Sequence, residues 1–539
     1  MSRPFRRNSQ FALPLILLLA GFGYFSASTI IAPASSTSGQ AVQPWPDGAE
    51  YLDAAVSLVR GGSYSIHIAG EEHPPRYPFG HSLWIAGALL LGADAGEAPH
   101  LANTIAGAIL MALIAAIFWR RSQRLEAGLA VLLLATLPAF VILCRSPMSE
   151  ITSTLIAVLG VYCLYRYARD GQVLSGSAGA FLLGLGLCFR TSSVLLAVFI
   201  PAAILARFVP SGIRQNLRPA IRDILLLGLS LGLGWIPALV YSAVTFGHPL
   251  ATGYGYWSPF WNASTAFDSK FFEPNLIYYW REFAQIETEF TSATTYSHGL
   301  SQGSYFTPAF PLLVLLSLWL LRRHPRLLLF AMAGFGYQLA TMFYFFKDAR
   351  LAFPIMVLAV LLIARALGNL SQRGDGAPRW RGFKIALALP LVLATVIGWP
   401  ASGGGFETLT LLQNGRAPLP ASVTMDDFLQ LEIPPPGLVL TDMAPPYVHA
   451  LLPEGTIVAP LNHDHLYRHN PDVFLYQNRQ RGQLLQDALT AEQDVWVLVG
   501  HRDIFSLAEV LAPPEGLAWE VVSSSGVVGG IARLVRVGG

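Results

Sequence analysis

The stretch "WPDGAEYLDAAVSLVRGG" (residues 45–62) places Asp47, Glu50, Asp53 and Arg60 close together in the sequence. It follows a long hydrophobic segment almost directly, in a chain of which only 13% is charged. A helix on the surface of a soluble protein would explain this concentration of charge, and so would a functional loop at a membrane face. The composition and the hydrophobic segments of the whole chain distinguish these two interpretations.

The composition is that of a membrane protein. The chain has 539 residues, of which 53% are hydrophobic and 13% charged, whereas soluble domains are about 25% charged. The mean hydropathy is +0.48, which indicates a polytopic membrane protein. The net charge of +2 comes without the clustered lysines and arginines of a nucleic-acid-binding face, so we expect no nucleic-acid partner. Three cysteines lie inside apolar runs and are expected to pack there.

Basic residues orient the first hydrophobic segment. Arg3, Arg6 and Arg7 precede the apolar run 11–31. A cleaved signal peptide is one interpretation, but the length of the run favours a retained transmembrane helix, which needs about 20 residues. The basic flank should stay in the cytoplasm. Residues 32–80 then lie outside.

The second apolar stretch, 79–93, is short for a membrane span. We interpret it as a tilted or re-entrant helix packed within the bundle. Later basic loops then face the cytoplasm, as the positive-inside rule requires. These loops are "RRSQR" (120–124), "YRYARDG" (165–171), "ARFVPSGIRQNLR" (206–218), "RRHPR" (322–326) and "QRGDGAPRWRGFK" (372–384).

The predicted fold is a polytopic α-helical bundle of about 11 to 13 transmembrane helices. The expected spans after the first are 98–119, 126–144, 150–167, 174–189, 192–207, 222–246, 305–321, 327–346, 350–369 and 383–400.

The tail from residue 418 on has a different pattern. "GLVLTD" (437–442), "GTIVAPL" (455–461) and "VWVLVG" (495–500) are typical of short buried strands. Residues 475–489 and 505–512 have helical patterns, and 517–537 predicts a closing hairpin. Alternation of strand and helix predicts a small α/β domain with a mainly parallel sheet, and an odd number of spans leaves it outside. The predicted organisation is therefore an N-terminal tail and first helix (1–31), a first extracytoplasmic loop (32–80), a helical bundle (81–417) with a large extracytoplasmic loop (247–304), and a soluble extracytoplasmic α/β domain (418–539).

The charges that do not fit the cytoplasmic loops all fall on the predicted outer face. A charge at the bilayer centre costs about 2.5–3.5 kcal/mol and less near an interface, so such residues usually face a polar cavity or pair with each other. Their gathering on one face suggests a single polar cavity there. The residues are Arg145, Glu150, Arg190, Lys347, Asp348 and Arg350 at span ends, with Asp47, Glu50, Glu71, Glu72, His73 and Arg76 in the first loop.

Each of these residues also has a structural interpretation. Asp47 with Glu50 forms a capping-box pattern at a helix start. Arg145 and Arg190 could extend toward lipid headgroups, and Lys347 could pair with the aspartate next to it. The functional interpretation explains the set together. Guanidinium groups match phosphate geometry, and a carboxylate on the same face can act as general base for an acceptor hydroxyl.

The chain resembles the GT-C glycosyltransferases of the protein O-mannosyltransferase and lipid A aminoarabinose transferase kind. The resemblance is carried by "DGAEY" (47–51) and "GEEHPPRYPFGHSLWIAGALLLG" (70–92), and more weakly by "SPMSE" (146–150) and "KDARLAFPIMVLAV" (347–360). It implies a GT-C-like fold and transfer of a sugar from a polyprenyl-phosphate donor to a lipid, glycan or protein hydroxyl on the extracytoplasmic face, usually with inversion. It also implies a multi-pass inner-membrane protein of bacterial type, with its N-terminus in the cytoplasm and membrane lipids around it.

The resemblance assigns candidate roles by position. The family's first-loop aspartate corresponds to Asp47, the expected general base, and its second acidic position corresponds to Glu150. Gly48 stands where the family often has another acid, and Glu50 where a basic residue is common, which leaves the sugar open. The expected substrate-binding residues are Tyr51, Glu72, His73, Arg76, Arg145, Arg190, Lys347 and Arg350.

A divalent cation is the one cofactor that the pattern brings into question. Glu72 and His73 are candidate ligands. Adjacent side chains rarely face one ion without a turn, so we expect no fixed metal there.

Two other functions remain open. A polyprenyl-lipid or solute transporter would show internal repeats and charges near the bilayer midplane; here the charges gather at one end. A non-catalytic scaffold would not need Asp47, Glu150 and several arginines on one face.

Overall fold

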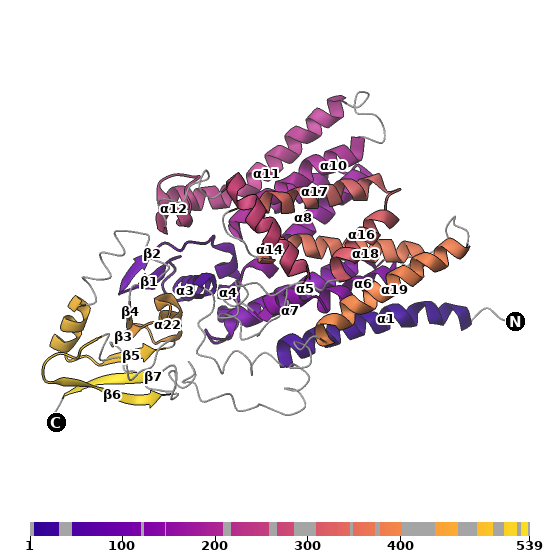
Figure 1. The fold of residues 1–539 in the computed structure, drawn as a ribbon. Coiled ribbons are helices and arrows are strands. Elements are labelled where there is room, and N and C mark those ends of the chain that lie inside the picture. Colours follow the sequence, from indigo (N-terminus) through magenta and orange to yellow (C-terminus); the bar gives the residue numbers. More distant parts are fainter. Residues whose placement is uncertain are drawn as a thin grey trace.

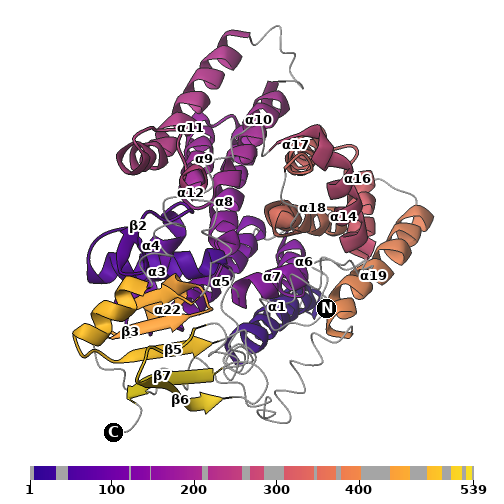
Figure 2. The same cartoon turned by 60° about the vertical axis from the view of Figure 1, so that its left-hand side comes forward.

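The computed structural model describes the chain in segments: residues 5–31, 46–119, 123–145, 147–208, 217–257, 267–284, 309–344, 349–371, 378–401, 437–461, 482–499, 511–524 and 530–536. Helices dominate up to residue 401, and a β-sheet dominates the described residues after 437. Figures 1 and 2 show the strands at one end of the molecule and the long helices extending away from them.

Six of the described helices are long and apolar enough to cross a membrane, by length and composition. Their spans are Ala12–Thr29, Ala98–Phe118, Glu150–Asp170, Thr191–Phe208, Leu217–Phe246 and Arg350–Leu370, and shorter apolar helices occupy Gly80–Leu90, Val173–Cys188, Ala309–Leu320 and Ile385–Val396. The chain is thus confirmed as a multi-pass helical membrane protein, while a total of 11 to 13 spans stays a prediction.

The helical part is built from these elements: α1 (Phe5–Ser26), η1 (Ala27–Ile31), α4 (Gly80–Leu90), α5 (Ala98–Phe118), α6 (Arg124–Ala135), α7 (Pro138–Arg145), α8 (Glu150–Asp170), α9 (Val173–Leu185), η2 (Gly186–Cys188), η3 (Thr191–Val198), α10 (Phe199–Phe208), α11 (Leu217–Phe246), α12 (Gly253–Trp257), η6 (Ser269–Phe271), α14 (Phe272–Ala284), α16 (Ala309–Leu320), α17 (Pro325–Thr341), η8 (Ala349–Ala352), α18 (Phe353–Ser371) and α19 (Pro378–Ala401).

One predicted span is divided in the structure, and another predicted helix is too short to cross the membrane. The expected single span 126–144 is two helices, α6 and α7, which meet just before Pro138. Proline has no N–H to continue the hydrogen bonds of a helix, so the break falls where the sequence places it. Helix α4 has 11 residues, or about 16 Å at 1.5 Å per residue. That is too short for a core of about 30 Å, in keeping with the non-spanning interpretation.

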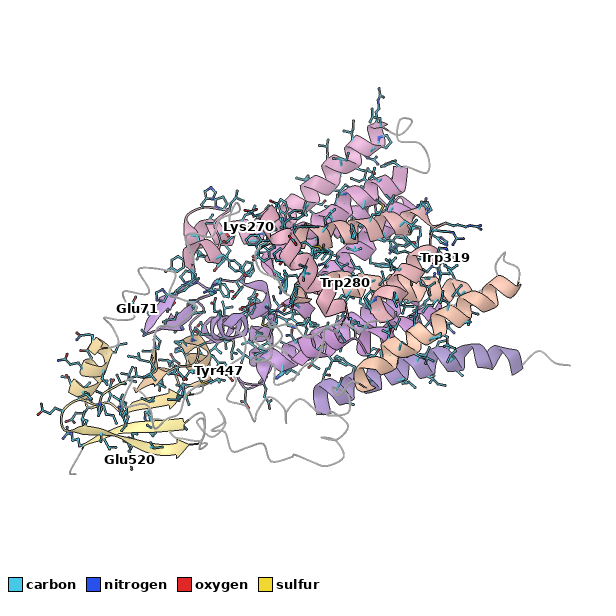
Figure 3. All side chains as sticks on the ribbon, in the orientation of Figure 1. Glu71, Lys270, Trp280, Trp319, Tyr447 and Glu520 are labelled. Atoms are coloured by element: carbon cyan, nitrogen blue, oxygen red, sulfur yellow. The ribbon has the colours of Figure 1, made fainter. Side chains whose placement is uncertain are left out.

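The outer surface of the helical part is apolar. Many large hydrophobic side chains of α11, α16 and α17 are exposed, which is the pattern of a surface in contact with lipid. Trp280 of α14 is 70% exposed and Trp319 of α16 is 39% exposed; both are labelled in Figure 3. Exposed tryptophans of this kind suit the membrane–water interface.

The C-terminal part contains the expected α/β fold. Its five-stranded sheet has the order β4-β3-β5-β7-β6. Strand β3 is parallel to both β4 and β5, and the β6–β7 hairpin closes the sheet in antiparallel fashion. The elements are β3 (Leu438–Thr441), α22 (Pro445–Leu451), β4 (Ile457–Pro460), β5 (Val495–Val499), β6 (Leu517–Ser524) and β7 (Gly530–Arg536). Residues 482–489 of the expected helix 475–489 are helical, and most of the expected helix 505–512 lies outside the described residues.

The first loop packs against this C-terminal part. It forms helix α3 (Pro46–Arg60) and a hairpin of β1 (Ile66–Ile68) and β2 (Glu71–His73). The Ala69 N–H donates to the Val458 carbonyl at 2.9 Å, and Ala54 shares a buried apolar cluster with Leu438 of β3. Figures 1 and 2 show α3, α22 and the hairpin between the sheet and the long helices. The loop and the C-terminal part therefore lie on one side of the bundle, while the boundary at 417/418 falls outside the described residues.

Candidate active site

The first residue of the candidate site is Asp47, which lies in the first turn of helix α3. The Tyr77 hydroxyl donates to Asp47 Oδ1 at 2.6 Å. The other oxygen, Oδ2, lies 3.8 Å from Nη1 of Arg350, and the Asp47 side chain is 23% exposed. A carboxylate in the first turn also faces the positive end of the helix dipole. Asp47 is therefore oriented by two neighbours and reachable from solvent.

A second carboxylate, that of Glu150, lies near the same arginine as Asp47. Glu150 is the first residue of α8 and is 1% exposed. Its Oε1 forms an ion pair with Arg190 and lies 3.5 Å from Nη1 of Arg350. Burying a charge is costly unless it is paired, and here the two arginines supply the pairing. Arg350 thus lies between Glu150 and Asp47 and connects the two carboxylates.

Close backbone packing brings these carboxylates together. A Cβ added at Gly48 would lie 2.6 Å from Cγ of Pro147, so α3 approaches the segment before α8 as only glycine allows. One turn later, the Tyr51 hydroxyl donates to Ser149 Oγ at 3.1 Å. The absence of an acid at position 48 has a steric cause, because Pro147 occupies the space that a side chain would need.

Tyrosine rings enclose the Asp47 side of the site. The rings of Tyr51 and Tyr77 are 5.2 Å apart, and those of Tyr77 and Tyr254 are 5.5 Å apart. Burial raises the pKa of Tyr77, and the Asp47 charge raises this pKa further. Burial likewise raises the pKa of Tyr51. Both phenols stay protonated, so Tyr77 remains a hydrogen-bond donor to Asp47.

The "HPPRYP" segment is held by a separate set of contacts. Glu50, fully buried on α3, accepts the backbone N–H of Arg76 at 2.7 Å, and the Arg76 Nε lies 3.9 Å from the same carboxylate. The indole of Trp257, also fully buried, donates to the Pro74 carbonyl at 2.8 Å. Trp257 therefore packs on the first loop and does not face lipid.

The remaining predicted site residues lie elsewhere or outside the described parts. Glu72 pairs with His67 across the β1–β2 ladder and is exposed. His73 Nδ1 lies 3.4 Å from the Tyr256 hydroxyl, and burial lowers the pKa of its imidazole. Arg145 ends helix α7, and its side chain is not described. Lys347 and Asp348 lie outside the described residues. The structure therefore brings together Asp47, Tyr51, Glu150, Arg190 and Arg350, and separates them from Glu72 and His73.

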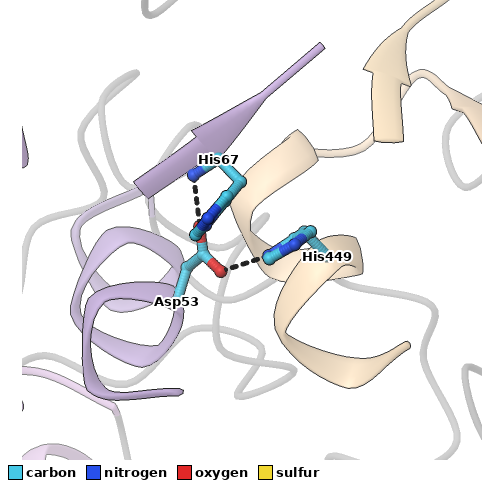
Figure 4. Close-up of side chains that lie close together, drawn as sticks. All are labelled: Asp53, His67 and His449. Atoms are coloured by element: carbon cyan, nitrogen blue, oxygen red, sulfur yellow. Dashed lines mark hydrogen bonds and ion pairs between the residues drawn. The ribbon is translucent and has the colours of Figure 1, made fainter. Parts of the chain in front are cut away.

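A second polar cluster on α3 was not found from the sequence. Asp53 meets His67 of β1 and His449 of α22, as Figure 4 shows. His449 is 396 residues from Asp53 along the chain. The only sequence signal was a carboxylate in the middle of a helix.

Comparison with known proteins gives a class. The sequence model of a family described as dolichyl-phosphate-mannose-protein mannosyltransferase matches residues 72–239. Among solved structures, the chain is similar to ArnT from Cupriavidus metallidurans bound to undecaprenyl phosphate, at 12% sequence identity and a TM-score of 0.59, covering 96% of this chain and 97% of ArnT. The apo state of ArnT aligns at 12% identity with a TM-score of 0.57, covering 96% of this chain and 97% of ArnT. No curated protein sequence matches the chain.

The fold is therefore the GT-C fold, shared along nearly the whole of both chains. Together with the family match, this confirms the expected resemblance to GT-C glycosyltransferases and the expected enzyme class, a membrane glycosyltransferase. Sugar, acceptor and residue roles are not part of this finding.

Proposed function

We propose that the protein transfers a sugar from a polyprenyl-phosphate donor to a hydroxyl acceptor on the extracytoplasmic face of the membrane, with inversion at the anomeric carbon. The observation that carries this proposal is the meeting of Asp47, Glu150, Arg190 and Arg350, which come from four separate segments of the chain. A partly exposed base and paired guanidinium groups suit such a transfer. ArnT, one of the structural neighbours, is seen bound to undecaprenyl phosphate, which is a polyprenyl phosphate.

Asp47, rather than Glu150, suits the role of general base. A general base must reach the acceptor proton directly or through one water. The Asp47 side chain is 23% exposed, and its Oδ2 is held only loosely by Arg350 at 3.8 Å. Glu150 is 1% exposed and lies between two arginines. We assign Glu150 to positioning the arginines.

The arginines suit the donor phosphate. A guanidinium has five N–H donors in a rigid fork, which matches the geometry of a phosphate group. Arg190 is 19% exposed, whereas Arg350 is 4% exposed. Arg190 is therefore better placed to contact a phosphate. Arg350 instead lies near both carboxylates, those of Asp47 and Glu150.

The chemistry balances in a single displacement. The acceptor oxygen attacks the anomeric carbon while its proton passes to Asp47. The bond between the anomeric carbon and the phosphate oxygen breaks, and its electron pair leaves with polyprenyl phosphate. Negative charge on the phosphate increases in this step, so cations placed beside it stabilise the transition state more than the ground state.

A direct experiment tests the activity. The purified protein in nanodiscs is incubated with a panel of labelled polyprenyl-phosphate sugars and with lipid, glycan and peptide acceptors. We expect release of free polyprenyl phosphate together with labelled acceptor. A transporter or flippase would move the lipid between leaflets and leave the sugar–phosphate bond intact, and that result would replace the proposal.

The proposed location is the plasma membrane, with the N-terminus in the cytoplasm and the first loop and C-terminal domain (418–539) outside. Cysteines introduced near residues 60 and 480 should react with an impermeant reagent in intact cells, and those near 122 and 374 only after lysis. Reaction of positions 60 and 122 from the same side would contradict the non-spanning interpretation of α4.

A further inference from the structure

Three potential metal ligands meet where helix α3 touches the C-terminal domain. The Nδ1 atom of His449 lies 2.7 Å from Oδ1 of Asp53, and the Nδ1 atom of His67 lies 3.6 Å from Oδ2 of the same carboxylate. One ligand atom from each residue lies within 4.8 Å of the other two. The two imidazole rings stack at 4.1 Å with an angle of 21° between them. Figure 4 shows both rings directed at the carboxylate.

The burial of Asp53 requires a positive partner. Its side chain is 0% exposed, whereas those of His67 and His449 are 23% and 17% exposed. The backbone N–H of His67 donates to Oδ2 at 2.7 Å, which holds the carboxylate in place but leaves its charge. A buried carboxylate is stable only with a cation beside it. In this cluster the cation is either a proton on an imidazole or a metal ion.

We propose that Asp53, His67 and His449 bind a divalent metal ion of the zinc class. Two imidazoles and one carboxylate are ligands that zinc accepts, with bonds of about 2.0–2.2 Å. A tetrahedral ion at those bond lengths holds its ligand atoms roughly 3.3 Å apart. The two Nδ1 atoms lie 2.7 and 3.6 Å from different oxygens of the Asp53 carboxylate, and one ligand atom from each residue lies within 4.8 Å of the other two. Side-chain rotations that bring the three ligand atoms around one point would form the site. Calcium and magnesium prefer oxygen ligands and fit less well.

Such a site would hold two parts of the chain together. It joins α22 of the C-terminal domain to α3, the helix that carries Asp47. Asp53 follows Asp47 by six positions, a rise of about 9 Å along the helix. A second link is already present next to it, where Arg60 Nη2 donates to the Leu452 carbonyl at 3.2 Å. The metal would fix the angle at which α3 presents its first turn to the active site.

The test measures metal directly and needs no catalysis. The full-length protein, purified in nanodiscs through a tag without histidine, is stripped with a chelator and titrated with Zn²⁺ and, separately, Co²⁺. We expect one tightly held ion per chain and the intense visible bands of four-coordinate Co²⁺. His449→Gln and His67→Gln keep a hydrogen-bonding side chain but remove a ligand. Each should lower Zn²⁺ affinity by more than the roughly 10–100-fold cost of losing an outer-shell partner.

His73→Gln is the matched control, because His73 lies on the same hairpin and contacts Tyr256 rather than Asp53. The His73→Gln variant should bind Zn²⁺ and Co²⁺ as the wild type does in the two separate titrations. The proposal is overturned if the stripped wild-type protein takes up no stoichiometric metal, or if both ligand variants bind as the wild type does. In either case the cluster is a hydrogen-bonded link between α3 and α22 without a metal ion. Sugar transfer plays no part in these readouts, so failure of the proposed activity would leave them interpretable.

Discussion

Two aspartates six positions apart on one helix have opposite surroundings. Asp47, in the first turn of α3, is 23% exposed and has a permanent cation, Arg350, as its charged neighbour. Asp53 is fully buried, and its charged neighbours are His67 and His449, which can lose their protons. The first environment leaves the Asp47 carboxylate accessible to a reactant. The second uses all of its carboxylate to connect two parts of the chain. The comparison shows that one short helix combines the proposed chemistry with the attachment of a domain.

The largest expected effect comes from changing each of these two aspartates to asparagine and comparing the turnover of the two variants. Asp47→Asn keeps the shape and an acceptor for the Tyr77 hydroxyl but loses the proton acceptor. Turnover at saturating donor should fall by about 10²–10⁴-fold, the usual contribution of general-base catalysis, while the protein folds normally.

Asp53→Asn is the matched variant for this experiment. It should lower the melting temperature and reduce turnover per folded molecule much less than Asp47→Asn does, because Asp53 acts on the active site only through the position of α3. Equal losses of turnover in the two variants would erase the distinction between a chemical and a structural aspartate.

Glu150→Gln tests whether the second carboxylate positions the arginines or takes the proton. Removing one member of a buried ion pair typically costs about 3–5 kcal/mol, and Arg190 and Arg350 both rely on Glu150. We therefore expect a clear fall in thermal stability and a weaker response to donor. A variant that folds as the wild type does but loses turnover as Asp47→Asn does would move the general base to Glu150.

Substitutions of the two arginines should have the next largest effects. Arg190→Lys keeps the charge but replaces a planar fork with a point charge. Charge-assisted hydrogen bonds are worth about 1.5–3 kcal/mol, and about 1.4 kcal/mol is tenfold in affinity, so the donor KM should rise by roughly 10–100-fold. The acceptor KM should change little. Arg350→Lys should affect donor KM less and kcat more, because Arg350 also contacts Asp47. Unchanged donor KM in both variants would return these arginines to a purely structural role.

The sequence predicted the membrane bundle and the strands of the tail, because hydrophobic length and strand patterns are local properties. It also singled out Asp47, Glu150, Arg190 and Arg350, which the structure brings together. It did not predict the cluster at Asp53, because His449 approaches from 396 residues away and a lone mid-helix aspartate resembles a solvated one. It grouped Glu72 with His73, although neighbours in a strand point to opposite faces. Proximity of this kind depends on tertiary packing, which no spacing rule encodes.

The smallest predicted effect concerns the hydroxyl that orients Asp47. Tyr77→Phe removes the donor to Oδ1, a contact of 2.6 Å, but keeps the ring against Tyr51 and Tyr254. Because Asp47 is partly exposed, a water can replace the hydroxyl, so we expect a loss of about 0.5–1.5 kcal/mol, or roughly two- to tenfold in kcat. Tyr64→Phe is the matched control, since the Tyr64 hydroxyl donates to the Tyr77 backbone carbonyl at 3.0 Å and not to the carboxylate. Steady-state kinetics of both variants should show a change in kcat for Tyr77→Phe alone. Equal changes in the two would mean that Tyr77 acts by packing, and that Arg350 and the helix dipole suffice to orient Asp47.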